Sequence, residues 1–161
     1  MRTYFGCWTS ILLAASPAAS ALDKACEPVV AAAEKTTAQA ARHSVAELDD
    51  GTRMEAIVVD GAFYASIGGT WRQMKIDLRA AERKLNAGMR SGEIPLSDCK
   101  DLGTQSVDGI ATIVIGYRIA LFGQPPAASR IHIGEDGLVY AIAADSQKVR
   151  YRYTGIAAPG I

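Results

Sequence analysis

Few side chains in this sequence could carry chemistry, and they are scattered along it. The two histidines, His43 and His132, do not belong to a metal-ligand motif. No Gly-x-Ser-x-Gly segment marks a hydrolase nucleophile, and residues 68–70 (Gly-Gly-Thr) lack the lysine of a phosphate-binding loop. The sequence therefore predicts no metal, no cofactor and no catalytic residue.

Paired carboxylates are the remaining candidates for acid–base chemistry. Asp49-Asp50 and Glu135-Asp136 each directly precede a glycine. Aspartate is favoured in such turns because its side chain hydrogen-bonds to the local backbone. We interpret both pairs as turns and expect a protein that is not an enzyme, with a hydrolase as the least favoured function.

The cysteines are Cys7, Cys26 and Cys99, and no Cys-x-x-Cys pair suggests redox chemistry. Cys7 lies in an N-terminal segment that we expect to be removed. The other two cysteines form an even pair, and a structural disulfide is their expected state in an oxidising compartment. We predict a Cys26–Cys99 disulfide, with two free thiols as the alternative.

The first 21 residues have the layout of a secretory signal peptide. Arg2 precedes an apolar core over residues 8–15, Pro17 follows, and residues 19–21 (Ala-Ser-Ala) are small. The apolar core is shorter than the roughly 20 residues that a membrane-spanning helix needs. We expect cleavage after about Ala21, a periplasmic or secreted location, and no membrane span afterwards.

The charge balance of the remaining chain gives no reason to expect a nucleic-acid partner. Residues 22–161 carry 16 basic and 17 acidic side chains, a formal net charge of −1. Nucleic-acid-binding domains are typically strongly basic. The length is that of one domain, and the composition does not indicate an oligomeric state.

Two helices are expected, at about residues 28–42 and 77–88. Pro28 suits a first helical turn, and the alanines after it have the highest helix propensity. The second helix has Asp77 as its N-cap and Gly88 as its end. Its packing face would consist of Leu78, Ala81 and Leu85.

Alternation of apolar and polar residues predicts nine strands separated by turns such as Asp60-Gly61 and Asp108-Gly109. Their expected ranges are 43–48, 53–59, 62–67, 70–75, 101–107, 110–120, 128–133, 138–143 and 147–154, with 89–100 as a connector. One face of the later strands is apolar. The opposite face carries basic side chains, namely Arg118, Arg130, His132, Lys148, Arg150 and Arg152.

This pattern is typical of an antiparallel sheet that is covered on one side. We predict an α+β fold in which residues 22–161 form a single domain, a curved antiparallel half-barrel of about nine strands with two helices on its apolar face. Tyrosines suit the rim of an apolar cavity, since the hydroxyl stays hydrated while the ring contacts a guest. The candidate ligand-binding residues, for which packing in a filled core is the alternative, are Tyr64, Trp71, Tyr117, Tyr140, Tyr151 and Tyr153.

The C-terminal third resembles the LolA/LolB-like superfamily of lipoprotein carriers. The resemblance lies in residues 101–109 (DLGTQSVDG) and the hydrophobic strand after them, followed in the order of that superfamily by 129–133 (SRIHI), 136–138 (DGL) and 151–153 (YRY). It implies a periplasmic, incomplete antiparallel barrel. The concave side of such a barrel is covered by helices and can hold an acyl chain or a hydrophobic peptide.

We therefore expect an exported envelope protein that binds a hydrophobic ligand or a lipidated partner between its sheet and its helices. The alternative is the same fold with a filled core, which would bind another envelope protein through a sheet edge or its basic face. The sequence does not distinguish these two functions.

Overall fold

The computed structural model describes residues 22–121 and 123–161. The predicted signal peptide, which includes Cys7, lies outside the described residues. Within them the helices are η1, a 3-10 turn (Lys24–Cys26), α1 (Glu27–Thr37) and α2 (Leu78–Ser91). The strands are β1 (Arg42–Leu48), β2 (Arg53–Val59), β3 (Ala62–Ile67), β4 (Thr70–Met74), β5 (Leu96–Val107), β6 (Ile110–Ile119), β7 (Ala127–Gly134), β8 (Val139–Ala144) and β9 (Gln147–Arg152).

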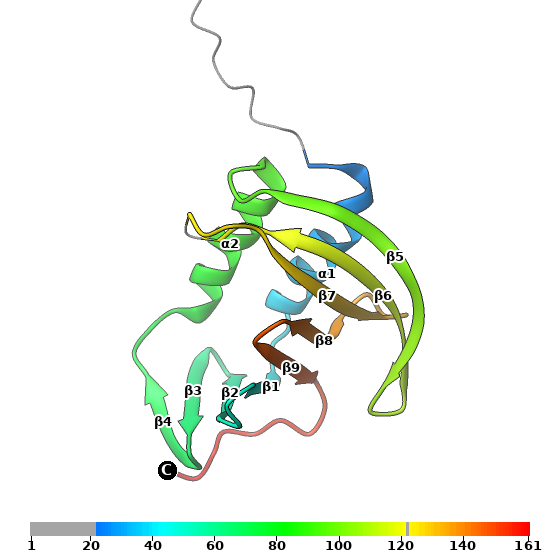
Figure 1. The fold of residues 1–161 in the computed structure, drawn as a ribbon. Helices are drawn as coiled ribbons and strands as arrows, with labels where there is room; N and C mark the ends of the chain where they lie inside the picture. The colour runs from blue at the N-terminus through cyan, green and yellow to red at the C-terminus, as the bar shows by residue number, and fades with distance from the viewer. Residues whose placement is uncertain (1–21, 122) are drawn as a thin grey trace, which may run out of the picture.

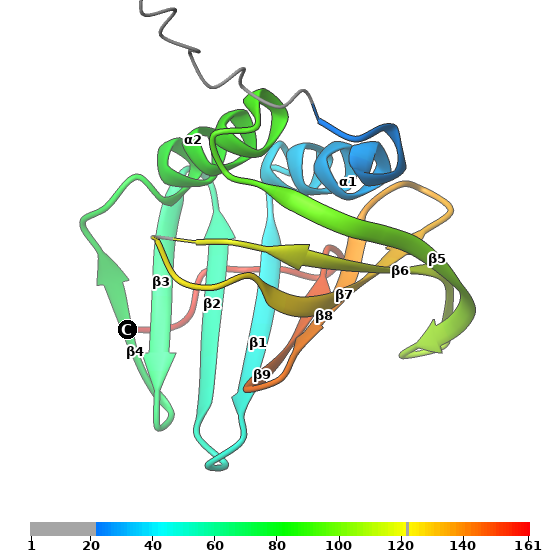
Figure 2. The ribbon, with the colours of Figure 1, turned by 45° about the horizontal axis from the view of Figure 1, so that its top comes forward.

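All nine strands of the described region form one antiparallel sheet in the order β4-β3-β2-β1-β9-β8-β7-β6-β5. The sheet is open, because β4 and β5 lie at its two edges. It bends so strongly that β5–β7 run steeply across β1–β4 (Figure 2). Helices α1 and α2 lie side by side along one end of this bent sheet (Figure 1). The predicted α+β half-barrel is confirmed.

The two faces of the sheet can be followed from strand to strand through the pairing register. We call the face that contacts α1 the inner face and the opposite one the outer face. The core lies where α1 packs on β6–β8, and its buried members are Val29, Ala32, Ile115, Tyr117, Ile131, Ile133 and Val139. The apolar alternation of these strands therefore points into the protein, as expected.

The first helix is shorter than the expected range of 28–42, because it ends at Thr37 and Arg42 already begins β1. The Arg42 backbone position pairs with Val58 of β2, and its side chain donates a hydrogen bond to the Thr36 carbonyl oxygen at 3.1 Å. Strand pairing and this capping contact thus override the helix propensity of Ala40 and Ala41.

The second helix is longer than expected, because it passes Gly88 and ends at Ser91. Gly92 follows in the left-handed conformation, with φ of 80°, which glycine adopts at no steric cost. Gly88 lies inside the helix, and close packing rather than backbone conformation requires glycine there. A Cβ atom there would lie 2.9 Å from Cδ1 of Ile94, so the absence of a side chain lets the following loop pack against the helix.

The expected connector 89–100 is also shorter, because β5 begins at Leu96 and includes Cys99. Its pairing with β6 is irregular between Ser97 and Lys100 and again between Asp101 and Thr104. These bulges interrupt the period-two pattern that identifies a strand in a sequence. Bulges are common on edge strands such as β5, where they discourage pairing with another chain. The other strands end within two residues of their expected limits.

Cys26 and Cys99 are joined by a disulfide, with 5.2 Å between their Cα atoms. Cys26 is fully buried at the start of α1, and Cys99 lies in β5. The disulfide therefore attaches the beginning of α1 to the sheet edge that the helix covers.

Replacing Cys99 by serine should lower the stability markedly, because the disulfide links residues 73 positions apart. Loop closure of this size is expected to contribute about 4 kcal/mol in the chain-entropy model. Urea unfolding of the variant should match that of the reduced wild type. Ser97→Ala, a change on the same strand, should leave the midpoint almost unchanged. A Cys99→Ser midpoint equal to that of the oxidised wild type would contradict a structural role.

Candidate functional site: an open apolar inner face beside a polar helix clamp

Helix α1 covers only part of the inner face, and the part formed by β1–β4 is left largely accessible, with Arg42 and Val58 as its buried members. The pairing register places Met54, Phe63, Ile67 and Met74 on the inner face, and none of them is buried. Ile67 is 66% exposed and Met74 is 40% exposed. Small residues, Ala46, Ala56 and Ala65, lie between them on the same face, and the exposed Arg72 of β4 lies opposite Ala65 at its edge. We call the four large apolar residues that are not buried, together with the three alanines, the open apolar face.

Grouped apolar side chains at the surface of a folded protein typically indicate a binding site. Ile76, in the loop that follows β4, adds another large apolar side chain that is 57% exposed. By contrast, the inner-face residues of β6 and β7 that contact α1 are almost fully buried, such as Ile115 and Ile131. One continuous sheet face therefore has a packed half and an accessible half.

Helix α2 does not close the accessible half, because it packs mainly on α1. We expected Leu78, Ala81 and Leu85 to form its packing face, and this prediction is wrong for Ala81 only, because Leu78 and Leu85 are half-buried. Its buried residues are Asn86, Gly88 and Met89, whereas Ala81 is exposed. Apolar spacing missed part of the packing face because polar side chains with specific partners, Glu82 and Asn86, also lie on it.

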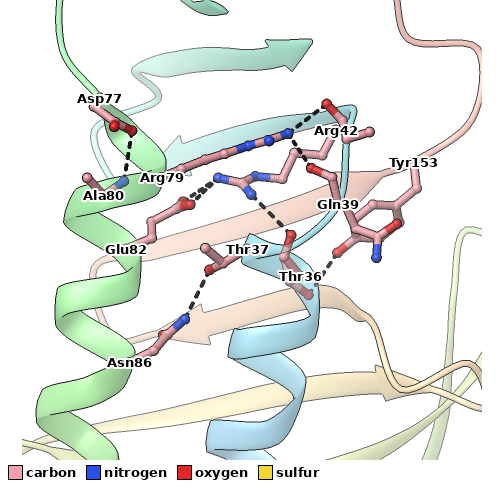
Figure 3. A network of polar contacts seen from close by, with 11 residues as sticks. Thr36, Thr37, Gln39, Arg42, Asp77, Arg79, Ala80, Glu82, Asn86 and Tyr153 are labelled. Atoms are coloured by element: carbon pink, nitrogen blue, oxygen red, sulfur yellow. Dashed lines mark hydrogen bonds and ion pairs between the residues drawn. The ribbon is translucent and has the colours of Figure 1, made fainter. Parts of the chain in front are cut away.

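One set of these polar contacts, shown in Figure 3, joins α2 to the end of α1. The Arg42 side chain, only 4% exposed, forms an ion pair with the Glu82 carboxylate of α2. Arg79 donates hydrogen bonds to the carbonyl oxygens of Gln39 at 2.6 Å and Ala40 at 2.8 Å. Asn86 Nδ2 donates to Thr37 Oγ1 at 3.0 Å. These donors occupy carbonyl and hydroxyl groups at the C-terminal end of α1.

A second set of contacts joins the far ends of the two helices. Arg90 of α2 donates from Nε to Glu34 Oε1 at 2.7 Å and from Nη1 to Glu27 Oε1 at 2.8 Å, both on α1. The hydrogen bond from Arg90 lowers the pKa of Glu34 and the same contacts raise the pKa of Arg90. Together the two sets form a polar clamp that fixes α2 on α1.

Four of the six predicted aromatic residues lie on the inner side. Tyr117 is in the core, and Tyr151 lies beside it near Arg42 and Glu82. Tyr140 and Tyr153 form an edge-to-face pair with ring centroids 5.6 Å apart. Their hydroxyls are hydrogen-bonded: Tyr140 donates to Asp136 Oδ2 at 2.8 Å, and Tyr153 donates to the Val139 carbonyl oxygen.

The other two aromatics, Tyr64 and Trp71, lie on the outer face. Tyr64 pairs with Ile57 and Trp71 with Ser66, positions opposite to the open apolar face. The Trp71 ring is 6.3 Å from that of His43, which shares this face. The six aromatics therefore do not line one cavity. In β3 both alternating sets of residues are largely apolar, so alternation alone could not assign Tyr64 to a face.

Arg42 and Glu82 were not predicted as site residues. One signal for Arg42 is present in the sequence, because Arg42, Ser44 and Ala46 alternate along β1 and fall on the same face. A single arginine on an otherwise small or apolar strand face requires a partner. The sequence gives no indication that Glu82, 40 residues later, is that partner.

Burial also changes the titration of the inner tyrosines. Desolvation raises the pKa of Tyr117 and of Tyr153, and it raises the pKa of Tyr151 to about 12. All three hydroxyls are therefore neutral at physiological pH. Their environment favours the uncharged form, as expected for groups that border an apolar interior.

Two further observations concern the described residues only. No three His, Cys, Asp or Glu side chains within 22–121 and 123–161 gather as a metal ion would require. In the same part of the chain no helix has the length and apolar character that crossing a membrane demands.

Comparison with family models gives no match, and neither does comparison with curated proteins. Among solved structures, the lipoprotein LppX of Mycobacterium tuberculosis matches 83% of this chain and 97% of its own, with a TM-score of 0.53 and 11% identity. The fold is LolA/LolB-like. The resemblance stated from the sequence is thus confirmed at the level of the fold.

MucB also matches 84% of this chain, with a TM-score of 0.43 and 16% identity. This chain spans only 60% of the length of MucB. The fold assignment rests on the architecture of the sheet and on the likeness to LppX.

The buried ion pair gives a first prediction about the site. Arg42→Met should destabilise the protein by about 3–5 kcal/mol, because it leaves the Glu82 carboxylate without its cation and removes the capping contact at Thr36. Arg83→Met, a loss of an exposed cation on the same helix, is the matched control and should cost little. Urea unfolding followed by circular dichroism measures both, and equal effects would contradict the role assigned to Arg42.

Tyrosine burial gives a second prediction. The pKa of Tyr151 is about 12 in the folded protein and about 10 in an unfolded chain. Its contribution to stability is therefore complete below pH 10 and is lost as the pH rises from 10 to 12, since the unfolded state releases the proton first. The free energy of unfolding should fall there by up to about 1.4 kcal/mol per pH unit from this residue alone. Tyr151→Phe should show a shallower fall; an identical slope would contradict the assignment.

Proposed function

We propose that this protein is an exported, non-enzymatic binding protein that holds a hydrophobic ligand, or the lipid chain of a partner, on the part of the inner sheet face that lies beside its helices and is left uncovered by them. Export is supported by the layout of residues 1–21 and by the Cys26–Cys99 disulfide, a bond typical of oxidising compartments. The LolA/LolB-like architecture agrees with the proposal but does not identify a ligand.

The open apolar face carries the proposal. Ile67 and Met74 have no polar function, yet they are held on the inner side of a bent sheet where their hydrophobic surface meets water. Covering one such side chain stabilises a complex by about 1.5–3 kcal/mol. A flexible acyl chain could follow the alanines between them, because Ala46, Ala56 and Ala65 leave the face shallow.

The polar clamp makes this surface a stable part of the fold. Because α2 is fixed to α1 by Arg42, Arg79 and Arg90, it need not bury the inner face of β1–β4 to stay in place. A protein whose stability depends on polar contacts there can keep an apolar surface available for a ligand.

The proposal predicts how two substitutions affect binding of a dansyl-labelled fatty acid. The double variant Ile67→Gln/Met74→Gln should bind this probe at least about tenfold more weakly, since it removes the apolar area of two contacting side chains. Both side chains are exposed, so thermal melting should be unchanged. Fluorescence titration provides the affinities.

Ile110→Gln is the matched control, because Ile110 is 39% exposed but lies on the outer face at the start of β6. It should leave binding of the probe intact. Equal losses in the control and in the double variant, or no binding by the wild type, would count against the proposal. Native mass spectrometry of the protein purified from the periplasm should in addition show a bound lipid mass that the double variant loses.

A further inference from the structure

Basic side chains of the outer face have acidic partners in one half of the sheet, whereas a row of them in the other half lacks such partners among the residues described. On β1 and β2 the basic side chains have acidic partners. Arg53 lies 3.2 Å from Glu55 and 3.8 Å from Glu47, and His43 Nε2 lies 2.8 Å from Glu55. This half of the face therefore neutralises its own charge.

On the other half, a row of basic side chains crosses the sheet without such partners. The pairing register runs from Lys100 to Gly116, Arg130, Ala143 and Lys148, so every second member is a cation. Adjacent strands are about 4.8 Å apart, which places successive cations about 10 Å apart. None of these three cations forms an ion pair with any residue that the structure describes.

This row lies in a groove rather than on a flat surface. The groove has a volume of about 860 Å³, and its small residues include Gly116, Ala128 and Ala143. Leu102 of β5 covers Gly116, since a Cβ there would lie 3.0 Å from Leu102 Cδ1, and its side chain stays 41% exposed. The groove thus offers space for a main chain, an apolar contact and several cations.

The groove carries a net positive charge. Arg118 joins the three cations of the row, and the carboxylates of Asp98 and Asp145 are the acidic groups of its lining. Asp98 lies 3.9 Å from Arg118. The pKa of His132 is lowered mainly by burial and in addition by the nearby positive charge of Arg130. At the β1 end of the row Lys148 lies opposite Glu47 in the register, whereas Lys100 and Arg130 have no acidic residue opposite them. Neighbouring like charges destabilise a fold, so such a row is typical of a binding surface.

We propose that this groove binds a short, extended, acidic segment of a partner polypeptide. In a polyproline II conformation every third side chain lies on the same side, with a repeat of about 9 Å. An acidic residue at every third position would therefore meet Lys100, Arg130 and Lys148 in turn. A continuous anionic membrane surface fits less well, because Asp98 and Asp145 would repel it and a plane does not fill a groove.

The test uses fluorescein-labelled (Glu-Pro-Pro)4 as the probe and measures fluorescence anisotropy with the full mature protein. The wild type should bind this peptide, with an affinity that falls as salt is added, and should not bind (Gln-Pro-Pro)4. Arg130→Gln/Lys148→Gln should weaken binding by about tenfold, as expected for the loss of two exposed ion pairs.

Arg152→Gln is the matched control, since Arg152 lies on the same face but outside the groove lining, and its loss should change the affinity by less than about twofold. Absence of wild-type binding to the acidic peptide would overturn the proposal. So would equal effects of the groove variant and the control, or loss of cosedimentation with phosphatidylglycerol vesicles in the groove variant while peptide binding persists. Binding of the dansyl-labelled fatty acid should be unaffected by the groove substitutions, which separates this site from the open apolar face.

Discussion

The structure depends on a mismatch between the width of its sheet and the length of the helix that packs on it. Nine strands spaced about 4.8 Å apart span about 40 Å, whereas the 11 residues of α1 extend only about 16 Å. The Cys26–Cys99 disulfide attaches one end of α1 beside β5, and near the other end Thr36 Oγ1 accepts a hydrogen bond from the Val139 backbone N–H at 3.0 Å. These two attachments place the helix over β6–β8, and the inner face of β1–β4 remains outside its reach.

The second helix could have covered the remainder, but its polar face is directed at α1 instead. Arg79, Glu82 and Asn86 form hydrogen bonds to the C-terminal end of α1 or to Arg42, and these contacts are specific in geometry. An apolar interface over β1–β4 would bury the residues that we assign to ligand binding. The polar clamp therefore fixes α2 without using the open apolar face.

Much of the fold was predictable from the sequence, because it follows from local rules. Turns such as Asp60-Gly61 and Asp108-Gly109 have positive φ at both residues, which is why aspartate and glycine mark them so clearly. The limits of α1, α2 and β5 were not predictable in the same way. The limits of α1 and β5 depend on the pairing of Arg42 with β2 and on bulges in β5, which involve residues distant in sequence or a shift in register. For α2 two glycines, Gly88 and Gly92, could each end the helix, and only the packing of Gly88 against Ile94 shows that the later one does.

The site was less predictable than the fold for a related reason. Alternation shows which residues of one strand share a face, but the face of Tyr64 relative to Tyr117 depends on the register across six strand pairings. The same register separates the two proposed sites. The open apolar face lies on the inner side of β1–β4, and the cationic groove lies on the outer side of β5–β9, behind the core that α1 forms. Since the packed core stands between them, a ligand on one face can bind without displacing the side chains of the other.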